Sequence, residues 1–222
     1  SEHSTNMSFL RNSIDFLIHA FYKYFAPDGA DLMLEKREKE WNELEAKAMK
    51  LLDNPYLLPN EAILKLYNPV LRLWVYPSFE PSKVWIFSEP NFKNVPVENL
   101  KIIRLVWDRN EEFRRLNDPL EGLKKGFHTE PNIEVRSIEI TKEVFERIFS
   151  ELKEIRFPAF ANYKKSVGVD GIRYGVETFD FTHRTVISWW SVYPEEWQNL
   201  TDWFEMTTEF LETEFSQTDD RP

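Results

Sequence analysis

The sequence contains no cysteine. Disulfides, thiolate zinc sites and cysteine nucleophiles are therefore excluded, and because cysteine is not used for cross-linking we expect a cytoplasmic protein. Glycine is also scarce, with 6 residues in 222, so a glycine-rich loop that cradles phosphate is not expected. The chain has no dinucleotide-binding, Walker, GxSxG or HExxH motif.

Long apolar runs are absent as well. The best candidate, residues 14–25, is interrupted by His19 and Lys23 and is shorter than the about 18 residues of a membrane helix. We therefore expect no membrane segment and interpret this run as one side of an amphipathic helix. Ser1 to Asn6 precede Met7, which we expect to be the natural start.

What the chain does contain predicts a folded protein, because 42% of its residues are hydrophobic. Apolar residues at helical spacing predict helices over 9–25 and 31–53, a short one over 61–67, and longer ones over 141–156 and from Pro194 onward. Alternating patterns predict strands over 71–76, 83–87, 101–107, 133–140, 166–169, 172–181 and 185–190.

Runs of strands without strict strand–helix alternation favour an α+β fold. The sequence therefore predicts a mostly antiparallel sheet of about six or seven strands, with two N-terminal helices, a middle helix and a C-terminal helix. Asp170-Gly171 is the best hairpin signal in the chain. We expect a single domain over 1–222, in which the helical part 9–53 packs on the part 70–215.

The negative charge of the chain is concentrated at its C-terminus. The formal net charge is −10, yet residues 195–222 hold nine acids and a single base, which leaves the other 194 residues near −2. An acidic chain is not expected to bind nucleic acid directly.

The C-terminal helix places its acids on one side. At about 100° per residue, Leu200, Phe204, Leu211 and Phe215 share a side with Trp197. The acids Asp202, Glu205, Glu209 and Glu212 cluster on the opposite side. Two like charges three or four residues apart on a helix destabilise it by about 0.2–0.5 kcal/mol per pair. One interpretation is a solvent-exposed face that keeps the protein soluble, with the repulsion among its acids offset by Lys or Arg from elsewhere in the fold. The other is a surface kept acidic to meet a basic partner.

Aromatic residues are dense in the same region, with 14 between Phe157 and Phe215. Most of them are expected in the core. Because successive strand residues point to opposite faces, a buried Trp189 would leave Trp190 exposed, unless helices cover both faces of the sheet. Trp190 beside Tyr174 would then mark a partner-binding groove.

Two groupings could support catalysis instead. His183 lies near Glu177 and Asp180 in the sequence, so a carboxylate–His–Ser188 relay can be drawn. Asp108, Glu111 and Glu112 follow a predicted strand and could hold Mg²⁺ in a nuclease, although acids in the first turn of a helix explain them equally. The four histidines show no metal-binding spacing, and we expect neither a metal nor a cofactor.

Three segments together resemble a known group of proteins. They are residues 169–177 (VDGIRYGVE), the strand end Ser188-Trp189-Trp190, and residues 194–200 (PEEWQNL). This pattern resembles uncharacterised bacterial proteins that are similar to immunity proteins of contact-dependent or polymorphic toxin systems. The resemblance covers the last quarter of the chain and carries over no catalytic residue. It implies a cytoplasmic protein that binds and blocks a toxin, often a basic nuclease.

The sequence therefore predicts a non-enzymatic binding protein, in which Asp202, Glu205, Glu209, Glu212, Trp190 and Tyr174 contact a basic protein partner. The alternatives are a small hydrolase or metal-dependent nuclease, and a structural subunit of a bacterial complex. The sequence makes no prediction of the oligomeric state.

Overall fold

The computed structural model describes residues 30–58, 67–90, 100–117, 130–158, 171–179 and 183–219. The chain divides into two compact units, Ser1–Ala46 and Lys47–Pro222. The boundary falls inside helix α2 (Ala30–Asp53), whose last turns belong to the second unit. The expected packing of residues 9–53 on residues 70–215 stays a prediction.

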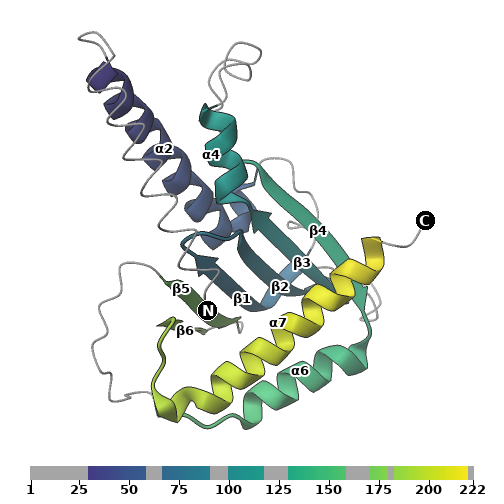
Figure 1. Cartoon of the computed structure of the whole chain (residues 1–222). Helices are drawn as coiled ribbons and strands as arrows, with labels where there is room; N and C mark the ends of the chain where they lie inside the picture. The colour runs from purple at the N-terminus through teal and green to yellow at the C-terminus, as the bar shows by residue number, and fades with distance from the viewer. Residues whose placement is uncertain are drawn as a thin grey trace. The chain divides into compact units, whose positions relative to one another are not determined.

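The second unit is built on one antiparallel sheet of six strands (Figure 1). The strands are β1 (Tyr67–Pro77), β2 (Ser82–Pro90), β3 (Leu100–Trp107), β4 (Ile133–Ile140), β5 (Ile172–Phe179) and β6 (Arg184–Trp190). Their order across the sheet is β4-β3-β2-β1-β5-β6, and every neighbouring pair is antiparallel. The fold is α+β, as the sequence predicts.

Four α-helices lie within the described residues. Besides α2 they are α4 (Arg109–Asn117), α6 (Lys142–Glu154) and α7 (Gln198–Asp219). The short 3-10 helices η1 (Pro55–Leu57) and η2 (Glu195–Trp197) follow α2 and precede α7. Thr141 caps α6, because its hydroxyl accepts a hydrogen bond from the Val144 amide. None of the described helices is long and apolar enough to cross a membrane.

Helices α6 and α7 lie side by side across one face of the sheet (Figure 1). Alternate strand residues supply this side of the core, including Leu73, Trp85, Phe87, Ile102, Ile138, Val176 and Trp189. Phe145 and Ile148 of α6 and Leu200, Trp203, Phe204, Leu211 and Phe215 of α7 pack against them. The apolar side predicted for the C-terminal helix is therefore the side that covers the sheet.

The intervening strand residues point to the other face of the sheet, where Trp74, Tyr76, Ile86, Ile103 and Leu105 are buried. The last turn of α2 reaches this face, because Arg72 of β1 donates hydrogen bonds to the Leu52 carbonyl and to Asp53. Both faces of the sheet thus contribute to the core, which explains the nearly continuous burial of β2 and β3.

Some expected elements fall on residues that the structure does not describe. The helix over 9–25 and the strand over 166–169 lie outside the described residues, as does the short helix over 61–67 apart from Tyr67, which begins β1. The hairpin partner of β5 is β6, and its other edge is occupied by β1. The strand expected over 172–181 is described as far as Phe179.

Candidate functional site: the exposed face of α7

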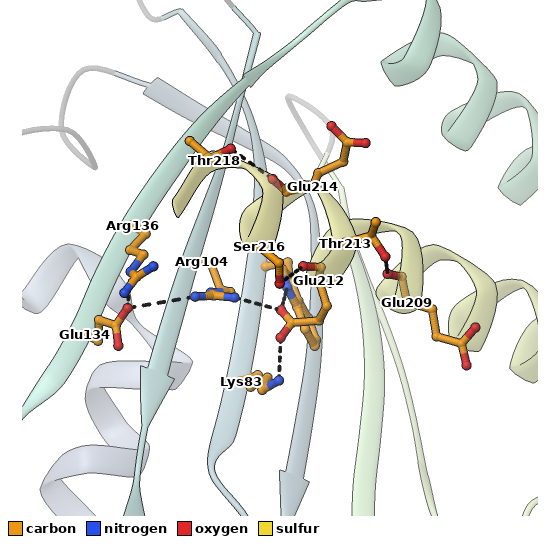
Figure 2. Close-up of polar contacts among 11 residues, drawn as sticks. Lys83, Arg104, Glu134, Arg136, Glu209, Glu212, Thr213, Glu214, Ser216 and Thr218 are labelled. Atoms are coloured by element: carbon orange, nitrogen blue, oxygen red, sulfur yellow. Dashed lines mark hydrogen bonds and ion pairs between the residues drawn. The ribbon is translucent and has the colours of Figure 1, made fainter. Parts of the chain in front are cut away.

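One acid of α7 is held against the sheet. The carboxylate of Glu212 forms an ion pair with Lys83 of β2 and accepts hydrogen bonds from Trp85 Nε1 at 3.0 Å and Arg104 Nη1 at 3.2 Å (Figure 2). Its side chain is 31% exposed. Burial raises the pKa of Glu212, but the hydrogen bond and charge of Lys83, together with Arg104 and Trp85, outweigh it and hold the pKa below its ordinary value.

The ion-pair cluster continues from α7 across the sheet to its edge. Arg104 of β3 lies between Glu212 and Glu134 of β4, at 3.2 and 3.8 Å, and Glu134 also pairs with Arg136 (Figure 2). The Arg104 guanidinium carbon also lies 4.6 Å from the centre of the Phe215 ring. We call Lys83, Trp85, Arg104 and Glu212 the α7 clamp, because together they fix the C-terminal half of this helix on the sheet.

This arrangement corrects one expectation. Glu212 was predicted on the solvent face with the other three acids, but it lies at the border of that face, where the sheet supplies two cations. The interpretation that cations from elsewhere in the fold offset the acids is therefore right for Glu212. Figure 2 shows Glu209, one turn earlier, extending away from Lys83 and Arg104.

The other three predicted acids face solvent. Asp202, Glu205 and Glu209 are exposed, and none of them forms an ion pair with any residue that the structure describes. Asp202 accepts a hydrogen bond from Gln198, one turn earlier on the same helix. Because residues three and four apart are neighbours on a helix, these carboxylates form a continuous acidic strip.

A methionine lies within this strip. Met206 is four residues after Asp202 and three before Glu209, and it is 71% exposed. An apolar, flexible side chain surrounded by charged groups is a common composition for a docking surface, because it adapts to the shape of a partner. The helical pattern that located the acids also places Met206 among them, so the sequence signal was present but unused. We call Asp202, Glu205, Met206 and Glu209 the α7 strip.

Tyr174 of β5 lies next to the α7 strip. Its ring stacks on Trp189 at 5.8 Å between centroids and meets Phe204 of α7 edge-on at 5.7 Å. Burial raises the pKa of Tyr174, and the negative charges of Glu205 and Glu80 raise it further. Glu80, in the turn between β1 and β2, therefore adds a carboxylate near this end of the strip, and sequence analysis missed it because it is remote in the chain.

Trp190 is not beside Tyr174. The sheet register pairs Tyr174 with Trp189 and Arg173 with Trp190, which puts Trp190 on the opposite face. There the Trp190 indole lies across Gly171, where an added Cβ would come within 2.3 Å of its Nε1. The predicted groove between Trp190 and Tyr174 is therefore wrong, because the alternation along β6 separates the two rings.

Glu177, the described acid of the catalytic relay considered above, has structural partners. Glu177 is 1% exposed, and its two oxygens accept hydrogen bonds from Arg72 Nη1, at 2.9 Å, and from Arg184. Ser188 is exposed on β6, whereas Asp180 lies outside the described residues. The Glu177 carboxylate therefore balances two arginines, which is the usual arrangement for a buried acid.

The acids after β3 also have structural roles. Asp108 caps α4 through a hydrogen bond from the Glu111 amide, and Glu111 pairs with Arg114 at 2.7 Å. Glu112 is 2% exposed and accepts the amide of Asn132 at 2.7 Å. Within the described residues no group of acids and histidines is arranged to hold a metal ion. The interpretation of these acids as the start of a helix is confirmed, because Asp108 precedes α4 and Glu111 and Glu112 lie in its first turn.

No protein-family model, curated protein or solved structure matches the chain.

Proposed function

We propose that this chain is a non-enzymatic protein-binding protein that engages a basic partner through the α7 strip. The observation that carries the proposal is the set of three exposed carboxylates on successive turns of α7, which surround an exposed methionine and have no ion pair within the described residues. Their negative charge is available to a partner.

The contrast with Glu212 supports this function over a plain solubility role. The fold supplies two cations and an indole N–H to Glu212. Among the residues that the structure describes, no cation pairs with Glu205 or Glu209, although repulsion within this i,i+4 pair costs the helix about 0.2–0.5 kcal/mol. A surface that keeps such repulsion uncompensated in the free protein is well suited to a partner that brings the cations.

A toxin is the partner that we propose more specifically. The resemblance of residues 169–200 to immunity proteins motivates this choice, and a basic toxin would be attracted to the α7 strip over several ångströms. Such electrostatic complementarity speeds association and favours the correct partner in the correct orientation. Both effects weaken as salt is raised. An immunity-type inhibitor in the cytoplasm would use this surface to capture the toxin rapidly.

A charge-neutralised variant tests the proposal. Asp202→Asn, Glu205→Gln and Glu209→Gln together remove three charges from the α7 strip. The matched control removes three from exposed positions of α6, with Glu146→Gln, Glu151→Gln and Glu154→Gln. Both variants and the parent chain would be used as bait in a lysate of the native host, with captured proteins identified by mass spectrometry.

We expect the parent and the α6 control to capture the same basic protein and the α7 variant to lose it. Association rates of the purified pair should fall by about tenfold or more in the α7 variant at low salt, and the difference should shrink at high salt. Equal association rates for the α7 variant and the α6 control would refute the proposal.

A further inference from the structure

Two acids of α7 lie on the same side of the helix, two turns apart. Glu205 and Glu212 are separated by seven residues, which is about 10 Å along the helix axis. In the sheet, Tyr174 of β5, Val75 of β1 and Lys83 of β2 are cross-strand neighbours in one row. The two ends of this row are two strand spacings apart, which is also about 10 Å. The spacing of the two acids therefore matches the spacing of Tyr174 and Lys83.

The helix runs across the strands from β5 toward β4, so each acid lies near one end of this row (Figure 1). Glu212 forms its ion pair with Lys83 at one end. At the other end Phe204, the residue before Glu205, meets the Tyr174 ring edge-on at 5.7 Å. Among the described residues, the row thus presents a cation to Glu212 but a neutral phenol to Glu205.

A second carboxylate reaches the Tyr174 end of the row from the turn between β1 and β2. Ser78 fastens this turn to the start of β5, because its amide and its hydroxyl both donate to the Gly171 carbonyl, at 3.1 and 2.9 Å. Two side chains of α4 also donate hydrogen bonds to carbonyls of the turn. Glu80 in this turn is exposed, and its charge acts on the Tyr174 hydroxyl together with that of Glu205. The turn therefore holds Glu80 close to Tyr174.

The chemistry of this end of the row suits a cationic side chain. Burial raises the pKa of Tyr174, and Glu205 and Glu80 raise it further, so the phenol keeps its proton at neutral pH. Val75 beside the ring is half-buried, which adds apolar surface. Within the described residues neither carboxylate forms an ion pair. Lysine and arginine have the complementary form, with an aliphatic stem that packs on apolar surface and a charged end that pairs with carboxylates.

We propose that Tyr174, Glu80 and Glu205 form a recognition site for one lysine or arginine side chain of the basic partner. Its charge lies between the two carboxylates, and its aliphatic stem lies on the phenol ring. This inference rests on the proposed function and names one contact that gives the α7 strip its specificity. Lys83 is the precedent within the fold, because the partner's cation does for Glu205 what Lys83 does for the acid two turns later.

A probe the size of one residue tests the site without the partner. Fluorine NMR of the full chain labelled with fluorotyrosine gives a signal for Tyr174, which Tyr174→Phe identifies by its loss. The cationic probes are N-acetylarginine amide and N-acetyllysine amide. N-acetylcitrulline amide is the neutral control, because it keeps the shape of arginine without the charge. We expect the cationic probes to shift the Tyr174 signal to saturation at millimolar concentration, since so small a ligand binds weakly, and the neutral probe to leave it in place.

Three charge-neutralised variants locate the bound cation. Glu80→Gln and Glu205→Gln should each raise the dissociation constant of the cationic probes by about two- to fivefold, as expected for an exposed ion pair. Glu209→Gln is the matched control, because it removes the same charge from an exposed position one turn further along the helix. It should leave the constant nearly unchanged at about 0.15 M salt, where more distant charges are screened. All three acids are exposed, so the variants should fold like the parent chain.

Three results would overturn the proposal: no saturable response to either cationic probe, an equal response to the neutral probe, or a loss of binding in Glu209→Gln as large as in Glu205→Gln. The capture experiment separates this inference from the proposed function. If the α7 variant loses the partner while the probes leave Tyr174 unaffected, the function stands and this site fails. If the cationic probes bind at Tyr174 while the α7 variant still captures the partner, the site stands and the proposed function fails.

Discussion

The α7 clamp gives a prediction whose size follows from its contacts. Glu212→Gln removes the negative charge but keeps an oxygen that can accept the hydrogen bond from Trp85 Nε1. Lys83 and Arg104 lose their carboxylate partner, and the Arg104 side chain is only 11% exposed. A hydrogen bond to a charged group contributes about 1.5–3 kcal/mol when buried, and the partial exposure of Glu212 reduces this. We expect a loss of about 1–2 kcal/mol in the free energy of unfolding.

Glu212→Ala should cost more, because it also leaves the buried Trp85 N–H without its acceptor. An unsatisfied buried donor costs about 1–3 kcal/mol, which brings the expected loss to about 2–4 kcal/mol. Glu209→Gln is the control on the same helix, one turn earlier, where the carboxylate is exposed. It should change the free energy of unfolding by less than about 0.5 kcal/mol. We expect a small gain in stability, because the substitution removes the repulsion between Glu209 and Glu205.

Urea unfolding followed by tryptophan fluorescence would measure these differences. With a denaturant slope of about 2–3 kcal/mol/M, Glu212→Gln should lower the midpoint by about 0.5 M without a change in slope. A midpoint equal to that of Glu209→Gln would refute the reasoning, since it would mean that the clamp adds nothing to the helix–sheet contact.

The same variant carries a pH dependence with a defined sign. The pKa of Glu212 in the folded protein lies below its ordinary value of 4.5, so its ionised form favours folding. This contribution is fully present above the unfolded pKa and is lost as pH falls through the lower folded pKa. The stability gap between the parent and Glu212→Gln should therefore be constant near neutral pH and close at acid pH. A gap that widens as pH falls below 4.5 would contradict the assigned shift.

Two further substitutions probe the opposite face of the sheet. Gly175→Ala should destabilise by about 1–3 kcal/mol in urea unfolding, because the new Cβ would lie 1.9 Å from the Trp74 ring, and Trp74→Leu in the same chain should reduce that cost. Arg72→Met should cost about 3–5 kcal/mol because it removes a buried partner of Glu177, whereas Arg184→Met should cost less because that side chain is 62% exposed. Adding Glu177→Gln to Arg72→Met should recover part of the loss, and no recovery would argue against an uncompensated charge as its cause.

The spacing of apolar residues predicted the helices and strands, because each element buries one of its sides and that burial is visible in its own sequence. The alternation of β4 and the helical spacing of α6 are visible in the sequence, and the structure confirms both. The partner of β5 was harder to predict. Asp170-Gly171 predicted a hairpin between residues 166–169 and β5, but residues 166–169 lie outside the described residues. The described residues of β5 pair with β6 on one side and with β1 on the other, and turn chemistry alone does not predict the pairing with β1, which is remote in the chain.

The site was predicted in part for the same reason. A helical wheel correctly separates Leu200 and Phe204 from Asp202 and Glu205, but it has no information about what the sheet presents at the border. Glu212 meets Lys83 and Arg104 there, from strands more than 100 residues away. Pairings of this kind depend on strand order, which local patterns do not encode.

The described contacts divide α7 into two parts with separate roles. Its C-terminal half is bonded to the sheet through Glu212, and the α7 strip projects from the turns before it. The two groups share no side-chain partner among the described residues, and only Glu209 and Glu212 are neighbours on the helix, so we expect their effects to be largely separate. Glu212→Gln should lower stability and leave association of the folded protein nearly unchanged, whereas neutralising the α7 strip should slow association and leave the urea midpoint nearly unchanged. If one variant impaired both properties equally, the exposed acids would owe their effect to helix stability, and the case for a charge-guided partner would fail.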